Sequence, residues 1–217
     1  MLHHYRNKQG FTLAEVLITL GIIGIVAALT LPSFIYNHRK QVVESRLKKF
    51  YTTFNQAIIL SENDNGEIAN WEDPDLSGIS GSEDWYNKYL AKYLNTVSVS
   101  RKEYDYIVWS KFSDGSAFGM RFSSRTVTTN FDVYFYPFAK NVDLCMKNSS
   151  EQTQCNGTKY FTFHFSKGGL IPYGGFNLSR DELLNACGNE NTDFRNFCTA
   201  LIILDGWKIS KDYPLRF

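Results

Sequence analysis

The chain has 217 residues, of which 43% are apolar and 16% aromatic, and its formal net charge is +1. This length allows one globular domain together with a membrane helix, and the composition is too apolar for a disordered chain. Residues 1–60 carry seven Lys and Arg against two Asp and Glu (7 − 2 = +5), whereas residues 61–217 carry sixteen against twenty (16 − 20 = −4). The mildly acidic second part gives no broad electrostatic reason to expect a nucleic-acid partner.

The chain begins with a short basic segment and continues into an apolar run. Arg6 and Lys8 precede Gly10, and positive residues before the first apolar segment favour a cytoplasmic N-terminus. The run Gly10–Leu31 contains one charged residue, Glu15. As a helix, the residues after Gly10 would extend about 31 Å, which is enough to cross the hydrocarbon core of a bilayer.

Two ordinary explanations exist for such a run. A secretory signal peptide has a shorter apolar core of about 7–15 residues and a small-residue cleavage site, and the best later site here, Ala28–Pro32, is a poor one. A plain membrane anchor is compatible with the composition. Neither explains Glu15, because a carboxylate at mid-bilayer costs roughly 2.5–3.5 kcal/mol and less near the interface, so such residues usually have a function.

The order of residues around Glu15 resembles a known signal. Lys8-Gln9-Gly10, then Phe11-Thr12-Leu13-Ala14-Glu15, then an apolar run to Leu31-Pro32, is similar to the class III signal of type IV pilins and type II secretion pseudopilins. The resemblance implies that a prepilin peptidase cleaves after Gly10 and methylates the new N-terminal Phe11. It also implies that Glu15 neutralises the N-terminal amine of a neighbouring subunit, although pairing with its own amine is an alternative.

The helix is expected to continue beyond the apolar run. Pro32 removes one helical hydrogen bond, which predicts a kink. Apolar residues then recur with heptad-like spacing and predict an amphipathic helix to about Leu60. They are Tyr36, Val43, Leu47, Phe50, Phe54 and Ala57. Gly21 and Gly24 either allow close helix approach or simply face lipid.

The remainder of the chain predicts a mixed head domain. Ser61–Ser82 is expected to be a loop, followed by a helix over Glu83–Asn95 with Ser82 as its N-cap. Alternating patterns then predict about four antiparallel strands, at Tyr104–Trp109, Ser116–Phe122, Asn130–Tyr136 and Lys159–Phe165. The fold class is therefore α+β, with the sheet packed on the upper part of the N-terminal helix, as in pilin heads.

The C-terminal third gives weaker patterns. Gly168–Gly175 is expected to be turn-rich, and Leu178–Cys187 is expected to include a short helix capped at Ser179. Phe197–Leu204 is compatible with either a helix end or a strand. Asp205-Gly206 then predicts a turn into a polar C-terminal tail.

The four cysteines form two close pairs in the sequence, Cys145/Cys155 and Cys187/Cys198. Three pairings are possible, and we favour disulfides between nearest neighbours. Metal binding is the rival interpretation, but no C-x-x-C spacing or neighbouring histidine supports it. Free buried thiols remain a second alternative. Disulfides would fit an exported head in an oxidising compartment.

No catalytic, cofactor-binding or metal-binding residues are expected, and we predict that the protein is not an enzyme. Beyond the leader only His38 and His164 remain, and neither lies in a recognisable catalytic motif. His164 is expected to be a structural residue of a strand.

Three segments follow from these patterns: a prepilin leader over residues 1–10, an N-terminal helix over residues 11–60 with residues 11–31 transmembrane, and a pilin-like head over residues 61–217. The resemblance implies a filament subunit held in the inner membrane with its head outside the cytoplasm until assembly. Its expected partners are prepilin peptidase, other pilin or pseudopilin subunits, an inner-membrane assembly platform and membrane lipid. The alternative function is a membrane-anchored extracytoplasmic ligand-binding protein.

Overall fold

The structure is a computed structural model that describes residue 10 and residues 12–75, 81–101, 107–122, 131–146, 154–166, 168–189 and 191–217, with the backbone alone at 99–101 and 192–193. The chain divides into two units, Met1–Arg39 and Lys40–Phe217. Helix α1 (Leu13–Asn65) contributes to both. The two units are described separately below.

The first unit consists of the apolar part of α1. This is the one helix among the described residues that is long and apolar enough to cross a membrane, with a mean hydropathy of 2.3 over its best 18-residue window. None of that window is buried within the chain. Pro32 lies inside α1 and does not end it.

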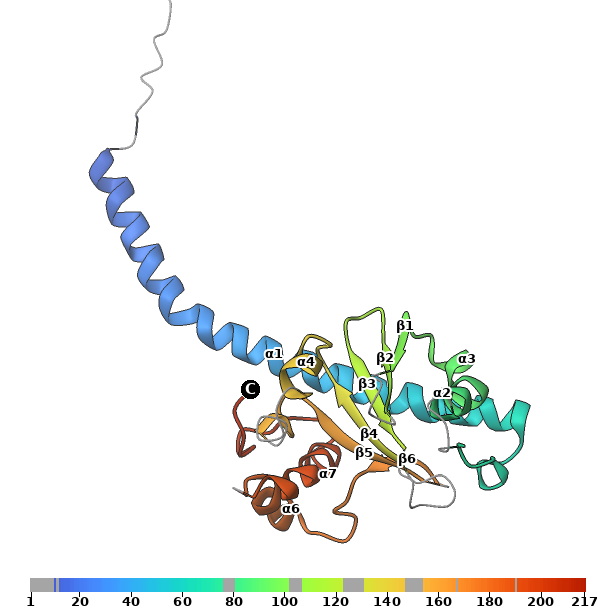
Figure 1. Cartoon of the computed structure of the whole chain (residues 1–217). Helices are drawn as coiled ribbons and strands as arrows, with labels where there is room; N and C mark the ends of the chain where they lie inside the picture. Colours follow the sequence, from blue (N-terminus) through green and yellow to red (C-terminus); the bar gives the residue numbers. More distant parts are fainter. Residues whose placement is uncertain are drawn as a thin grey trace, which may run out of the picture. The chain divides into compact units, whose positions relative to one another are not determined.

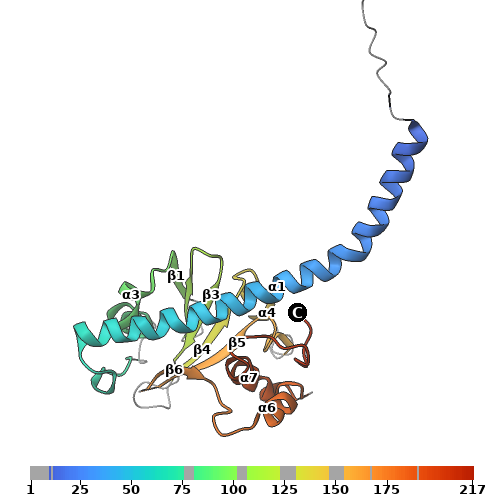
Figure 2. The ribbon, with the colours of Figure 1, turned by 180° about the vertical axis from the view of Figure 1, so that it is seen from behind.

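The second unit is built on an antiparallel sheet whose six strands follow one another in chain order. Its strands are β1 (Ser98–Arg101), β2 (Ile107–Lys111), β3 (Ala117–Arg121), β4 (Phe131–Tyr136), β5 (Phe161–Ser166) and β6 (Gly169–Pro172). The second part of α1 lies along one face of this sheet (Figures 1 and 2). The α+β pilin-like architecture is thereby confirmed.

The sheet has more strands than the four expected from the sequence. The two additional strands, β1 and β6, are the two edges of the sheet and have four residues each. Strand β6 lies in the segment expected to be turn-rich because of its flanking glycines. It forms a strand because Leu170 and Ile171 pair with Phe165 and His164 of β5. Of the first expected strand, Tyr104–Tyr106 lies outside the described residues.

The predicted apolar stripe of α1 forms the core against the sheet. Phe50 stacks on Phe135 of β4 with ring centroids 4.3 Å apart, and Phe54 meets Phe118 of β3 edge-on at 5.7 Å. Val43, Leu47 and Ala57 are also buried. Tyr36 belongs to the first unit and is 37% exposed.

A second, smaller cluster covers part of the opposite face of the sheet. Helix α4 (Asn141–Met146) and the segment after it bring Cys145, Cys155 and Tyr160 onto Trp109 and Tyr136. Residues from Asp143 to Met146 are therefore helical. The indole of Trp109 lies over Gly119, where a Cβ would come within 2.7 Å of the ring, so glycine is required for this packing.

Helix α1 ends at Asn65, beyond the expected end near Leu60. The polar residues after Leu60 favour a loop by composition, but Ser61 is fully buried and its carbonyl accepts a hydrogen bond from Asn65. Gly66, at φ +79°, then ends the helix with a hydrogen bond from its N–H to the carbonyl of Glu62. Tertiary packing therefore overrides the local preference.

The aromatic helix predicted over Glu83–Asn95 is present but begins earlier and is irregular. It consists of α2 (Gly81–Tyr86), the π-helical segment η2 (Asn87–Ala91) and α3 (Lys92–Leu94), after the short 3-10 helix η1 (Ile68–Asn70). Ser82 lies inside α2, so its predicted N-cap role is wrong. Trp85 and Tyr89, one turn apart, are both buried in the core.

The C-terminal part contains α6 (Arg180–Cys187), the 3-10 helix η3 (Thr192–Phe197) and α7 (Cys198–Leu204). The predicted cap at Ser179 is confirmed, because Ser179 and Glu182 form a reciprocal capping box. The ambiguous apolar segment Phe197–Leu204 is mainly helical. The tail after Trp207 is not simply polar, because Ile209 and Tyr213 are buried in the core.

Candidate processing and assembly site

The predicted cleavage position lies between Gly10 and Phe11. A Cβ on Gly10 would meet no atom within 4 Å, so no contact within the described chain requires glycine at this position. A need for glycine would then come from the peptidase that binds the segment. Phe11 lies outside the described residues.

Thr12 and Glu15 form a capping box at the start of α1. The carboxylate of Glu15 accepts hydrogen bonds from the backbone N–H of Thr12 at 2.8 Å and from its hydroxyl at 2.9 Å. The Thr12 hydroxyl oxygen in turn accepts a hydrogen bond from the Glu15 N–H at 3.2 Å. The box satisfies backbone N–H groups that otherwise lack partners at a helix start. It also holds the Glu15 carboxylate beside residue 12, one residue from the predicted new terminus.

The polar side chains within the apolar part of α1 are also satisfied locally. The hydroxyl of Thr19 donates to the carbonyl of Val16 at 3.0 Å, and that of Thr30 donates to the carbonyl of Val26 at 2.9 Å. In lipid an unsatisfied polar group costs several kcal/mol, so these bonds suit a membrane-spanning helix. A Cβ on Gly21 or Gly24 would meet nothing within 4 Å, which leaves this helix surface open for a neighbour or for lipid.

Several polar side chains attach the second part of α1 to the head, and sequence reasoning missed them. Glu44 is 9% exposed and accepts hydrogen bonds from the Ile209 N–H at 2.8 Å and from Lys208 at 3.0 Å. The amide of Asn55 accepts from the Leu170 N–H and donates to the Leu170 carbonyl, so it pairs with edge strand β6. The only signal in the sequence is their position beside the apolar stripe.

A further attachment is Arg46, which holds the turn between β2 and β3. Its guanidinium donates to the carbonyls of Pro137, at 2.5 Å, and Asp114, and lies 5.0 Å from the centre of the Phe138 ring. Lys49 pairs with the Asp114 carboxylate at 2.9 Å. One turn of the sheet is thus fixed to two cationic side chains of α1.

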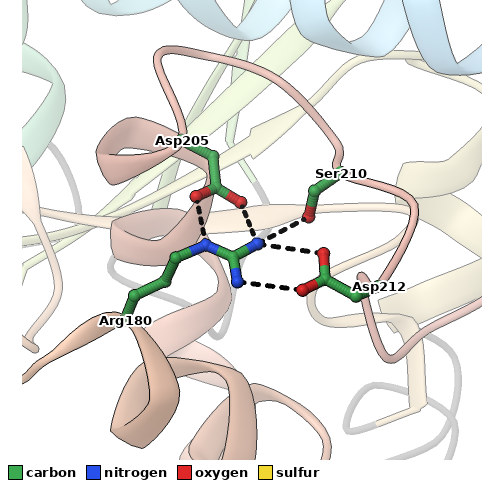
Figure 3. Close-up of polar contacts among 4 residues, drawn as sticks. All are labelled: Arg180, Asp205, Ser210 and Asp212. Atoms are coloured by element: carbon green, nitrogen blue, oxygen red, sulfur yellow. Dashed lines mark hydrogen bonds and ion pairs between the residues drawn. The ribbon is translucent and has the colours of Figure 1, made fainter.

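The C-terminal segment is fixed by Arg180, the first residue of α6 (Figure 3). Its guanidinium donates to Asp205 at 2.6 Å, to Asp212 at 2.9 Å and to Ser210 at 3.3 Å. These hydrogen bonds lower the pKa values of both carboxyl groups. The carbonyl of Ser210 also accepts from Lys40 of α1. Because the partners lie in separate segments, no local sequence pattern could have revealed this network.

The cysteines are joined as nearest neighbours. Cys145 is bonded to Cys155 and Cys187 to Cys198, with Cα–Cα separations of 5.9 and 4.7 Å. The first disulfide belongs to the small cluster behind the sheet, and the second links the end of α6 to the start of α7. Each disulfide therefore cross-links a short helix of the head to a segment that follows it in the chain.

His164 lies on β5 with its Nδ1 3.5 Å from the carboxylate of Asp132 on the neighbouring strand. Its ring also meets Tyr173 edge-on at 6.2 Å. Within the described ranges, no group of three or more His, Cys, Asp and Glu residues is arranged to hold a metal ion.

Two families match this chain. Residues 33–217 match a family described as "Family of unknown function (DUF6613)", and this match covers most of the chain. The chain belongs to that family. Residues 5–31 match the prokaryotic N-terminal methylation motif, which contains Gly10, Thr12 and Glu15. Neither the curated proteins nor the solved structures gave a match.

The methylation motif is the signal of type IV pilins and pseudopilins, so the chain is a pilin-like or pseudopilin-like precursor. The family match begins at residue 33, directly after the motif ends at residue 31. In this chain the family match covers the rest of α1 and the head, and the prepilin-type motif precedes it.

Proposed function

We propose that this protein is a structural subunit of a type IV pilus or of a type II secretion pseudopilus-like filament. Prepilin peptidase removes residues 1–10 and methylates Phe11, and the subunit then assembles through its N-terminal helix. Before assembly, residues 11–31 hold it in the inner membrane with its head outside the cytoplasm. It has no enzymatic role in this proposal.

The observation that carries the proposal is the methylation motif over residues 5–31, within which Thr12 and Glu15 cap an apolar helix. A plain anchor needs apolar residues alone. Here a carboxylate is instead held at the helix start, where cleavage would create a charged amine one residue before Thr12. An amine and a carboxylate that pair inside an apolar bundle compensate charges that are each costly alone.

The exposed apolar surface of α1 supports the same proposal. Leu13 is 79% exposed and Leu29 is 75% exposed, so this surface has no partner within the described chain. Lipid covers it before assembly and the helices of other subunits cover it afterwards. The two disulfides of the head suit the oxidising environment in which such a filament grows.

Mass spectrometry and N-terminal sequencing of the mature protein test this proposal. We expect the mature chain to begin with an N-methylated Phe11 and to occur in filaments that can be sheared from the cell. An unprocessed Met1 would instead favour a membrane-anchored binding protein. A chain that begins near Leu31 would indicate a secretory signal peptide, and either result would contradict a filament subunit.

A further inference from the structure

The exposed apolar surface of α1 does not end where the apolar run of the sequence ends, at Leu31. Phe34 is 70% exposed, Ile35 is 61% exposed and Tyr36 is 37% exposed, and all three follow Pro32 in the same continuous helix. Over residues 37–58 of α1, all of which are described, no large apolar side chain is exposed. The apolar surface of α1 that faces away from the chain therefore extends more than one helical turn past Leu31.

The chemistry of the helix surface changes over the next turn. Tyr36 is followed by Asn37, His38 and Arg39, all of which are exposed. The ring of His38 stacks on that of Phe34, with ring centroids 6.4 Å apart. An apolar surface that passes through a tyrosine to cationic residues is typical of a helix that leaves a bilayer. Amphipathic rings lie at the level of the headgroups there, and cations meet the lipid phosphates.

The adjacent cations Arg39 and Lys40 lie in different units of the chain. Lys40 is the first residue of the second unit, is half-buried and donates a hydrogen bond to the carbonyl of Ser210 at 3.4 Å. Arg39 is the last residue of the first unit and is exposed. A guanidinium presents planar donors that match the oxygens of a phosphate in bidentate geometry, so Arg39 suits contact with lipid phosphates.

Glu15 gives an independent measure of depth. A carboxylate costs less near the interface than at mid-bilayer, so the most favourable position of Glu15 is the cytoplasmic boundary of the hydrocarbon core. From Glu15 to Leu31 the helix rises about 24 Å (31 − 15 = 16 residues), which is shorter than a core of about 30 Å. From Glu15 to Tyr36 it rises about 32 Å (36 − 15 = 21 residues), or about 30 Å along the membrane normal at a common tilt of about 20°. The length of the helix and its exposed apolar surface thus indicate the same outer boundary.

We infer that, before assembly, the membrane-embedded part of α1 extends to Tyr36, and that Tyr36 and Arg39 contact the phosphate groups of phospholipids in the extracytoplasmic leaflet. The inference rests on the proposed function and deepens it, because it names the lipid surface that holds the waiting subunit. Phe34 and Ile35 then lie in hydrocarbon. Pro32 also lies within the bilayer, at a rise of about 6 Å below Tyr36.

This placement fixes the height of the subunit in the membrane from both ends. Glu15 resists movement toward the centre of the bilayer, and Arg39 resists the same movement from the other side. Every waiting subunit therefore presents its Glu15 carboxylate at the same level. A subunit that enters a filament has to exchange the lipid contacts of Phe34 and Ile35 for contacts with other chains.

Single-cysteine labelling of the full-length chain tests this depth. All four native cysteines form disulfides, so an introduced cysteine supplies the one free thiol. The chain is reconstituted without reductant into vesicles of phosphatidylethanolamine and phosphatidylglycerol, and a membrane-impermeant maleimide is added on the side that carries the head. Ile35→Cys is compared with Ile25→Cys as the embedded reference and Gln41→Cys as the aqueous reference. Each rate is normalised to the rate of the same variant in denaturing detergent.

We expect Ile35→Cys to react about tenfold more slowly than Gln41→Cys and at a rate close to that of Ile25→Cys, because hydrocarbon disfavours the reactive thiolate. The protection should persist when the chain is diluted with more lipid. Loss of protection on dilution would show that other copies cover this surface and would overturn the inference. A rate for Ile35→Cys equal to that of Gln41→Cys would also overturn it and leave the proposed function intact. Fast labelling of Ile25→Cys would contradict the membrane span itself, and with it the proposed function.

The phosphate contact is tested in the Ile35→Cys background. Arg39→Glu should raise the labelling rate severalfold, because lipid phosphates repel a carboxylate and the helix moves outward. Arg39→Lys should restore the protection. The matched control Arg216→Glu reverses an exposed cation of the C-terminal tail and should leave the rate unchanged. An Arg39→Glu variant that behaves like this control would overturn the contact between Arg39 and the phosphates.

Discussion

The two parts of α1 differ in what covers their apolar side chains. In Leu13–Arg39 the apolar side chains are exposed, as for Leu20 at 60% and Ile25 at 65%. In Lys40–Asn65, Leu47 and Phe54 are completely buried against the sheet. One continuous helix therefore contains a stretch that has its partner within the chain and a stretch that does not.

The difference explains how the head can be stably folded while the first stretch keeps an apolar surface available for assembly. The second stretch folds with the head and needs no other molecule. Removal of apolar surface from water contributes about 25 cal/mol per Å². The first stretch can gain this free energy only through contact with lipid or with other chains. Changes in the second stretch should therefore affect folding, and changes in the first should affect membrane residence and assembly.

The largest expected contrast comes from matched truncations in the two stretches. Phe54→Ala removes a buried ring that contacts Phe118 and Phe165, and it should cost about 3–5 kcal/mol. For a unit of this size, each kcal/mol lowers the melting temperature by about 2–4 °C, so we expect a decrease of roughly 6–20 °C. Leu20→Ala should leave the head transition unchanged. Thermal unfolding of the detergent-solubilised full chain measures both.

Equal decreases for the two variants would contradict the division of α1. Membrane fractionation gives the complementary measurement, because Leu20→Ala removes apolar surface from the proposed membrane span and Phe54→Ala does not. A head transition that responds to Leu20→Ala would mean that the first stretch packs on the head.

The disulfides provide the second contrast, since all four cysteines lie in the second unit. Replacement of Cys187 and Cys198 by Ser should cost about 2–4 kcal/mol, because the bond closes a short loop between two helices. The same change at Cys145 and Cys155 should have a similar effect through the cluster behind the sheet. Mass mapping without reductant should recover both bonded pairs, and free thiols would contradict this.

Neither disulfide variant should alter membrane insertion, because the first stretch does not depend on the fold of the head. A variant that is degraded before it reaches the membrane would contradict this independence. Quantification of membrane-bound, unprocessed and processed chain after a pulse label distinguishes these outcomes.

Much of α1 could be predicted because its patterns are periodic and long. The apolar run, the stripe from Val43 to Ala57 and the signal around Gly10 are each local, so they can be recognised without knowing what the segment packs against. The four central strands were also recognisable from alternating residues. The helix end at Asn65 was not, because the burial of Ser61 depends on the packing of the head.

The contacts that hold the head on α1 could not be predicted, because they join residues distant in sequence. Glu44 meets Ile209, and Asn55 meets Leu170. A single sequence gives no indication of such pairs. At the candidate site the situation is reversed: Thr12 and Glu15 are three residues apart, so their types and spacing alone were informative, although their capping box was found only in the structure.

One glutamate from each stretch of α1, Glu15 and Glu44, gives the third prediction. Glu44→Ala leaves the Ile209 N–H without its acceptor and Lys208 without its partner, which should cost the head about 1–3 kcal/mol. Glu15→Ala should leave head stability, membrane insertion and cleavage unchanged but reduce incorporation into filaments, because the new amine loses its carboxylate. Thermal unfolding and filament yield per processed subunit separate the two effects.

Normal filament yield for Glu15→Ala would refute an assembly role for this carboxylate. Thr12→Ala is a useful companion variant, because it breaks the capping box but keeps the carboxylate. An N-cap change of this kind costs about 1 kcal/mol in helix stability, so its effect on assembly should be smaller than that of Glu15→Ala.

The smallest effect concerns pH and the turn that Arg46 and Lys49 hold. Burial would raise the pKa of Asp114, but hydrogen bonds from Lys49 and Ser116 outweigh it and lower the pKa from 3.8 to about 2. A carboxyl group with a lowered pKa in the folded state contributes stability above its unfolded pKa and loses it as pH falls. The head should therefore lose this contribution between about pH 4 and pH 2, and Asp114→Asn should remove that part of the pH dependence. Lys49→Gln should weaken it partially, since Ser116 still donates two hydrogen bonds. Acid titration of the melting temperature measures all three chains, and an unchanged slope for Asp114→Asn would show that this carboxylate does not stabilise the attachment of the turn to α1.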